Sequence, residues 1–179
     1  MKKILVLSDT HLYNDIFDHF NFNDFDYLIH CGDSSMDPND ELIKKFLTVN
    51  GNHDQDTFPR LIVKKIEDMN VLITHGNDFN IYYGEEEILE YMEMNNLDVC
   101  FHGHTHVPNF IHKNNKYIIN PGSTMMNRGE IGFGTYAIVI IDGKNLSITY
   151  YSSETFEAVP LKDIIKNAAI LEEYKELLK

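Results

Sequence analysis

Positive charge is scarce in this sequence. The 15 Lys and Arg residues stand against 28 Asp and Glu residues, which gives a net charge of −13. Proteins that bind nucleic acid or anionic membranes normally present a basic face, and no basic cluster occurs along the chain. The composition therefore predicts neither specific nucleic-acid binding nor attachment to a membrane. An anionic substrate would need a strong local positive charge, for which a bound metal ion is the obvious candidate.

Cysteine and long apolar runs are scarce as well. Cys31 and Cys100 lie in separate apolar runs without a CxxC companion, which predicts reduced thiols in the core. The apolar run that begins at Ile4 is ended by Ser8, whereas a secretory signal needs roughly 7–15 apolar residues there. The stretch Tyr136–Ile141 is far shorter than the ~20 residues that span a bilayer. We therefore expect a cytoplasmic protein.

The chain has no repeat, low-complexity tract or linker, so we expect a single domain over residues 1–179. Helical patterns occupy 39–45, 85–95 and an amphipathic stripe at 161–178. We expect this last helix to pack on the body of the fold; a subunit interface, and with it a homo-oligomer, is the alternative. Ten short apolar runs predict strands: Lys3–Leu7, Tyr27–Cys31, Phe46–Val49, Leu61–Ile66, Val71–Thr74, Val99–Phe101, Phe110–His112, Lys116–Ile119, Tyr136–Ile141 and Leu146–Tyr151. This pattern favours an α/β sandwich with two layers of strands and helices outside.

Side chains that can bind metals follow five of these apolar runs. Sites in open α/β sheets form beyond the carboxyl ends of the strands, and glycine allows close approach of the backbone there. Because side chains alternate along a strand, Asp9 and His11 are expected to point the same way. Each motif alone is weak, but five together indicate one shared site: Ser8-Asp9-Thr10-His11, Cys31-Gly32-Asp33, Gly51-Asn52-His53-Asp54, Thr74-His75-Gly76 and His102-Gly103-His104-Thr105-His106.

The number of candidate ligands exceeds what one four-coordinate ion can use. Two ions that share one carboxylate would use them all, so we expect two divalent metal ions per chain. A mixture of imidazole, carboxylate and carboxamide suits Mn²⁺, Fe or Zn²⁺; we favour Mn²⁺ and leave Ni²⁺, Zn²⁺, Fe and Mg²⁺ open. A pair of ions ~3.5–4 Å apart is suited to in-line displacement at phosphorus. The candidate ligands are Asp9, His11, Asp33, Asn52, His75, His104 and His106.

The motif order D-x-H, G-D, G-N-H-D, H-G and G-H-T-H resembles the calcineurin-like metallophosphoesterase superfamily, and within it the small YfcE-like phosphodiesterases. The resemblance covers about residues 2–152 and leaves out the C-terminal helix. It implies a four-layer α-β-β-α sandwich of two mixed sheets. It further implies that a first ion is bound by Asp9, His11, Asp33 and His106, and a second by Asp33, Asn52, His75 and His104, with Asp33 as the bridge.

The same resemblance gives catalytic roles to His53 and Asp54. His53 would contact the phosphate and protonate the leaving oxygen, while Asp54 would accept a hydrogen bond from its far ring nitrogen. A water between the ions would lose a proton, and the bridging hydroxide would attack phosphorus in line. We therefore expect a dinuclear-metal phosphodiesterase for small phosphodiesters, weak on monoesters, because no separate cap domain encloses the site.

Two other functions are possible for a chain with these motifs, and the sequence disfavours both. A non-catalytic scaffold of the same fold, as in the retromer coat complex, would bind a protein partner, but His53 and all seven ligand positions are intact here. A metallo-β-lactamase-like enzyme needs H-x-H-x-D-H, and Val107-Pro108-Asn109 follows His106. The segment Asn120–Ser123 resembles a loop that recurs near this family's site, but its turn chemistry alone explains its residue types. It is therefore outside the predicted site, as are four residues that packing or surface exposure explains: His102, Tyr82, Tyr83 and Arg128.

Overall fold

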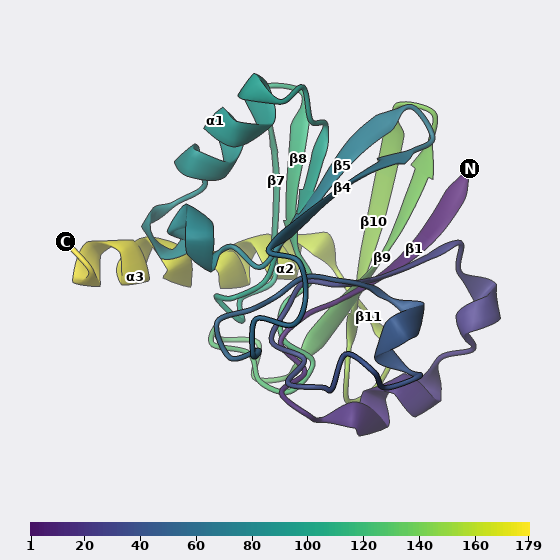
Figure 1. Cartoon of the computed structure of the whole chain (residues 1–179). Coiled ribbons are helices and arrows are strands. Elements are labelled where there is room, and N and C mark those ends of the chain that lie inside the picture. Colours follow the sequence, from purple (N-terminus) through teal and green to yellow (C-terminus); the bar gives the residue numbers. More distant parts are fainter.

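The computed structural model describes all 179 residues, Met1–Lys179. Two mixed sheets pack face to face (Figure 1). The first sheet has the order β11-β10-β9-β1-β2-β3, formed by Ala158–Val159, Asn145–Ser152, Thr135–Asp142, Lys2–Leu7, Tyr27–His30 and Leu47–Thr48. The second has the order β4-β5-β6-β8-β7, formed by Leu61–Ile66, Met69–Thr74, Val99–Phe101, Lys116–Asn120 and Asn109–Lys113. All ten predicted strands are present, and β11 is the one that the sequence pattern missed.

Each sheet contains three neighbouring parallel strands, which lie at one edge of the first sheet and at the centre of the second. β1, β2 and β3 run parallel in the first sheet, and β5, β6 and β8 do so in the second. In the first sheet the antiparallel strand β9 lies beside β1, with Lys2 opposite Ile141, whereas in the second sheet the antiparallel strands β4 and β7 flank the parallel set on both sides. Parallel neighbours end at the same edge of a sheet, so the segments that follow them are brought together.

The main core lies between the sheets, where Ile4 and Val6 of β1 share one apolar cluster with Val71 and Ile73 of β5. The alternate residues of β1, such as Leu5, face the opposite side and pack in a second cluster. Both faces of β1 are therefore buried, which explains why its sequence is apolar without alternation.

The outer layers differ from each other. Helix α1 (Glu86–Met94) covers the second sheet, as predicted, and buries Ile88 and Met92. The outer face of the first sheet is covered by the 3₁₀ helices η1 (Asn14–His19), η2 (Phe22–Asp24) and η3 (Ile43–Lys45). The helix predicted over 39–45 is wrong, since only η3 forms there. The carboxylates of Asp37 and Asp40 accept the backbone N–H groups of Asn39 and Leu42, and such local bonds compete with a helix.

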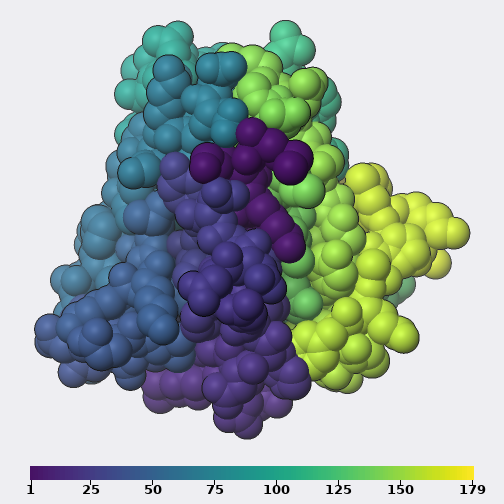
Figure 2. Space-filling view, turned by 90° about the vertical axis from the view of Figure 1, so that its right-hand side faces the viewer, coloured from purple at the N-terminus to yellow at the C-terminus, as the bar shows by residue number.

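The C-terminal helix predicted over 161–178 is divided in two. α2 (Leu161–Ala168) and α3 (Ile170–Leu177) meet at Ala169, whose N–H bonds to the carbonyl of Lys166 and so tightens the turn. α2 places Ile164 in the core between the sheets, whereas the segment as a whole stands out at one side of the body (Figure 2). Helices η4 (Asn77–Phe79) and η5 (Ile81–Tyr83) complete the fold. None of its helices has the length and apolar character needed to cross a membrane.

Candidate metal centre and active site

All seven predicted ligands lie in one group beyond the ends of five parallel strands. Four of them follow strands of the first sheet: Asp9 and His11 after β1, Asp33 after β2 and Asn52 after β3. The other three follow strands of the second sheet: His75 after β5, and His104 and His106 after β6. The site therefore lies across the seam between the two sheets.

The loops that carry these ligands have unusual backbone conformations. Five of the ligands have a positive φ: Asp9 (52°), His11 (46°), Asp33 (54°), His104 (70°) and His106 (59°). Residues other than glycine rarely adopt this left-handed region, and each such residue stores about 1–3 kcal/mol of strain, as is common at functional sites. The expectation that strand alternation aligns Asp9 with His11 is wrong, because β1 ends at Leu7 and the loop itself brings the side chains together.

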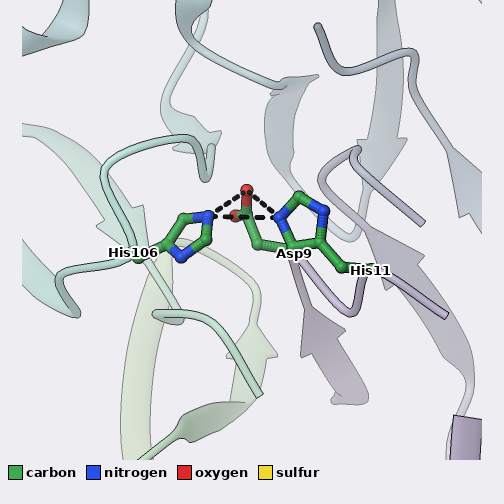
Figure 3. A group of neighbouring side chains, drawn as sticks. All are labelled: Asp9, His11 and His106. Atoms are coloured by element: carbon green, nitrogen blue, oxygen red, sulfur yellow. Dashed lines mark hydrogen bonds and ion pairs between the residues drawn. The ribbon is translucent and has the colours of Figure 1, made fainter. Parts of the chain in front are cut away.

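One donor group consists of Asp9, His11 and His106, whose side chains point toward one another (Figure 3). The Oδ1 atom of Asp9 lies 3.2 Å from Nε2 of His106 and 4.0 Å from Nε2 of His11. This oxygen is buried and has no hydrogen-bond partner, which is costly unless a positive charge offsets it. A divalent cation between these atoms would satisfy it.

The second donor group consists of Asp9, Asp33 and His75. Nε2 of His75 lies 3.3 Å from Oδ2 of Asp33 and 3.2 Å from Oδ1 of Asn52. The ring of His104 lies 5.0 Å from that of His75. Oδ2 of Asp33 is also 3.9 Å from Nε2 of His11, so both Asp9 and Asp33 lie between the two groups. The assignment of Asp33 as the bridge stays a prediction.

The surrounding backbone fits closely around these donors. A Cβ atom at Gly51 would collide with the carboxylate of Asp33, and one at Gly103 would collide with Ser8 and Asp9. Nδ1 of His75 bonds to the carbonyl of Cys31 at 2.7 Å, which directs Nε2 into the site. Glycine is therefore needed at positions 51 and 103, because only a residue without a side chain lets the backbone approach the donors so closely.

The pKa values of the donor side chains reflect the negative charges of Asp9 and Asp33, which lie close together in the site. Burial alone would lower the pKa of His75, but the bond to Asp33 and the charges of Asp9 and Asp33 raise it to about 9. Burial and the neighbouring His75 lower the pKa of His104 to about 4. Burial opposes ionisation of Asp9, yet His106, His75 and Ser8 hold the pKa of Asp9 below its ordinary value. Two buried carboxylates surrounded by imidazoles form a donor set that fits divalent metal ions.

The predicted hydrogen bond between Asp54 and His53 does not form. Instead, Asp54 accepts the backbone N–H groups of Asp33, Ser35 and Gly51, each at 2.8 Å. Both carboxylate oxygens are used in this way because the loops after β2 and β3 wrap around the side chain. Asp54 therefore holds two ligand-bearing loops together rather than orienting an imidazole.

His53 lies at the rim of the donor group. Its side chain is exposed, with its ring edge-on to that of His11 at 5.4 Å between centroids. Its backbone N–H donates to Oδ1 of Asp33 at 2.8 Å. The residue lines an open polar cavity of about 480 Å³, together with the segment Ser35–Asn39. An imidazole in this place can reach a group bound at the donors.

The Asn120-Pro121-Gly122-Ser123 segment, which is not among the predicted site residues, forms hydrogen bonds to the loops that carry the ligands. Asn120 is fully buried and donates to the carbonyl of Gly103 and to Oγ1 of Thr105. Ser123 donates to the carbonyl of Asp9 at 2.8 Å. The resemblance of this loop to one near the family's site was the available signal. His102, also left out, is 3% exposed and bonds through Nδ1 to the carbonyl of Gly103.

Comparison with known proteins identifies the family. The model of the calcineurin-like phosphoesterase superfamily domain matches residues 1–144. A probable metallophosphoesterase of Methanocaldococcus jannaschii, MJ0623, is 31% identical over 134 residues, which are 69% of this chain and 68% of that protein.

Solved structures agree with this assignment. A predicted phosphoesterase from Streptococcus pneumoniae is 27% identical, with a TM-score of 0.81 over 89% of this chain and 93% of the other. Vps29 of Entamoeba histolytica, crystallised with Zn²⁺, shares the fold at 19% identity, with a TM-score of 0.74 over 88% of this chain and 96% of the other. The two-sheet α/β architecture and the metal-ligand groups agree with the family match, and the chain belongs to the calcineurin-like phosphoesterase superfamily.

Proposed function

We propose that this chain hydrolyses phosphodiester bonds in small substrates, with two divalent metal ions held by the seven predicted ligands. The observation that carries the proposal is the pair of donor groups that meet at Asp9 and Asp33, together with the buried Oδ1 of Asp9, which has no hydrogen-bond partner. Bound ions would supply Lewis-acid activation of water and neutralise charge on the phosphoryl oxygens. Mn²⁺ is the proposed ion, since the donors are imidazole, carboxylate and carboxamide groups without a thiolate.

The protein's own side chains have distinct tasks in this proposal. Asp9, His11, Asp33 and His106 would hold one ion, and Asp33, Asn52, His75 and His104 the other. His53, exposed beside His11, would donate a proton to the leaving oxygen. Asp54 and Asn120 fix the loops that carry the ligands, so the donors need little reorganisation during the reaction.

Diesters are favoured over monoesters by charge. At neutral pH the phosphoryl group of a diester carries one negative charge and that of a monoester close to two. A chain with net charge −13 repels the doubly charged phosphoryl group more strongly wherever no cationic side chain offsets that charge. The cavity beside His53 is open and polar, so it has room for the second ester group. A monoester turned over much faster than any diester would contradict this preference.

Hydrolysis of bis-p-nitrophenyl phosphate tests the proposal. Metal-stripped protein should be inactive and should regain turnover when Mn²⁺, Ni²⁺, Zn²⁺ or Mg²⁺ is added back. His53→Ala should lower kcat by about 10²–10⁴-fold, the usual contribution of a general acid. The matched control is His112→Ala, since His112 is exposed on β7 and stacks on Tyr117 away from the donors.

The competing function is a scaffold of the same fold that binds a protein partner. The likeness to Vps29 concerns the fold alone, whereas the complete ligand set and the exposed His53 favour an enzyme. Two ions bound per chain without turnover of any diester or monoester would favour the scaffold.

A further inference from the structure

The chain has only two arginines, Arg60 and Arg128, and both lie beside the donor group. Arg60 lines a hollow with Asn52 and is paired with carboxylates, at 3.3 Å from Asp78 and 3.6 Å from Asp56. Arg128 has no carboxylate within ion-pair distance, although the chain has 28 acidic residues. Its guanidinium instead donates to the hydroxyl of Tyr82 at 2.5 Å. An exposed arginine without a carboxylate partner therefore flanks the site.

The loop that carries Arg128 is fixed from two sides. On one side, its backbone N–H donates to the carbonyl of the ligand His106 at 3.1 Å. On the other side, the C-terminal helices hold it, because Tyr174 of α3 donates to the carbonyl of Arg128 at 2.7 Å and Asn167 of α2 accepts the N–H of Ile131 at 3.0 Å. The position of the Arg128 backbone relative to the donors is therefore set by several bonds.

Tyr82 sets the place of the guanidinium itself. Its ring is edge-on to that of His104, at 5.1 Å between centroids, and its hydroxyl is 3.4 Å from the carbonyl of His104. Tyr82 therefore lies between the ligand His104 and the guanidinium, which is outside the donor group. One of the five N–H groups of the guanidinium donates to Tyr82. The remaining N–H groups lie in the same plane and can bind the oxygens of a phosphate or a carboxylate.

We propose that Arg128 binds a second anionic group of the substrate, a phosphate or carboxylate carried on one of the diester's two alcohols, and that Tyr82 positions the guanidinium for it. This inference rests on the proposed function. An arginine that lies beyond the ligands reaches a group attached to the metal-bound phosphate rather than that phosphate itself. Because Tyr82 is neutral, it orients the guanidinium without cancelling its charge, unlike the carboxylates that hold Arg60.

The test uses the fact that a chain with two arginines gives two arginine Nε–H signals in a ¹⁵N spectrum. Arg128→Gln and Arg60→Gln assign them. Zn²⁺-loaded protein is titrated with thymidine 3′,5′-bisphosphate and with thymidine 5′-phosphate. We expect the bisphosphate to shift the Arg128 signal and leave the Arg60 signal in place. Calorimetry should show that Arg128→Gln weakens bisphosphate binding about tenfold more than monophosphate binding, while Arg60→Gln leaves both within twofold.

A matched pair of substrates gives the second readout, namely the p-nitrophenyl esters of thymidine 5′-phosphate with and without a 3′-phosphate. The preference in kcat/KM for the ester that carries the 3′-phosphate should fall in Arg128→Gln, and should be partly restored in Arg128→Lys. Tyr82→Phe should shift the Arg128 signal in the free protein, which a purely structural role in packing would not do. An Arg128 signal that the bisphosphate leaves unmoved, or equal losses for both ligands, would overturn the inference. Bis-p-nitrophenyl phosphate turnover in the wild type reports separately on the proposed function.

Discussion

Asp54 illustrates how a residue within a catalytic motif can act on the backbone instead of on the substrate. Its three backbone bonds join the loop after β2 to the loop after β3. Hydrogen bonds to a charged acceptor are stronger than neutral ones, and Asn at this position would turn an N–H group toward other N–H donors. Asp54→Asn should therefore lower the free energy of unfolding by about 1–3 kcal/mol and weaken metal binding.

Urea unfolding and calorimetric metal titration check this prediction. The matched control is Asp56→Asn, since Asp56 is exposed and pairs with Arg60 at 3.6 Å. Wild-type stability and metal affinity in Asp54→Asn, together with a loss of turnover, would restore the role of orienting His53.

A buried histidine gives the protein a specific sensitivity to acid. His30 is fully buried, accepts the N–H of Gly32 at Nδ1 and bonds to Thr10 through Nε2. Burial lowers the pKa of His30 to about 4, below its ordinary 6.5. Between these values the unfolded chain binds the extra proton, so this histidine makes stability fall as the pH falls from about 6.5 to 4, by up to about 3 kcal/mol.

His30→Gln, which cannot take up this proton, should give a flatter curve of unfolding free energy against pH over that window. The measurement uses urea unfolding in EDTA, so that metal binding does not contribute. His112→Gln, at an exposed position, should keep the wild-type slope. A wild-type slope in His30→Gln would show that other groups cause the acid sensitivity.

At the level of single residues, the sequence predicted which side chains gather but not how all of them are used. The motif order placed seven donors after five strands, and the structure brings all seven together. The partner of Asp54 could not be predicted, because adjacency in Asn52-His53-Asp54 does not say which way a turn aims each side chain. The sequence also contains no indication that the backbone at Asp9 and His11 adopts the left-handed conformation.

Among the elements, strands were predicted better than helices. A strand such as β1 or β9 is a short apolar run with turn residues at both ends, so its pattern is local. The segment 39–45 has a helix-like start, but the side chains of Asp37 and Asp40 bond to nearby backbone and favour turns. The break at Ala169 has no local signal, since Ala is the best helix former; it accompanies the contacts that α2 and α3 make with different parts of the fold.

Helix α2 places one apolar side chain in the core between the sheets. Ile164 is fully buried between the sheets, whereas its neighbour Ile165 is 52% exposed. Ile164→Ala should lower the free energy of unfolding by about 2–5 kcal/mol, and Ile165→Ala by less than about 1 kcal/mol, although both remove the same atoms. Chemical denaturation of the two variants gives this comparison. Equal losses would mean that α2 does not dock as described.

At the scale of the whole molecule, the negative net charge of the protein opposes the approach of the proposed anionic substrate. A chain with net charge −13 repels an anionic diester until it reaches the site. Salt shortens the screening length from about 30 Å at 0.01 M to about 8 Å at 0.15 M. KM for bis-p-nitrophenyl phosphate should therefore fall severalfold over this range, while a neutral ester should show no change. A KM that rises with salt would mean that local positive charge dominates the approach of the substrate.

The order of strands in the first sheet has a consequence for the protein while it is being made. β1 has apolar side chains on both faces and pairs with β9, with Lys2 opposite Ile141. A ribosome must therefore translate nearly the whole domain before one edge of β1 gains its neighbour. Until then, the hydrophobic strand Ile4–Leu7 has β2 on one edge and no partner on the other, and an unpaired strand edge of this kind promotes association with other chains. Truncated products that end before Thr135 should be aggregation-prone and should depend on chaperones.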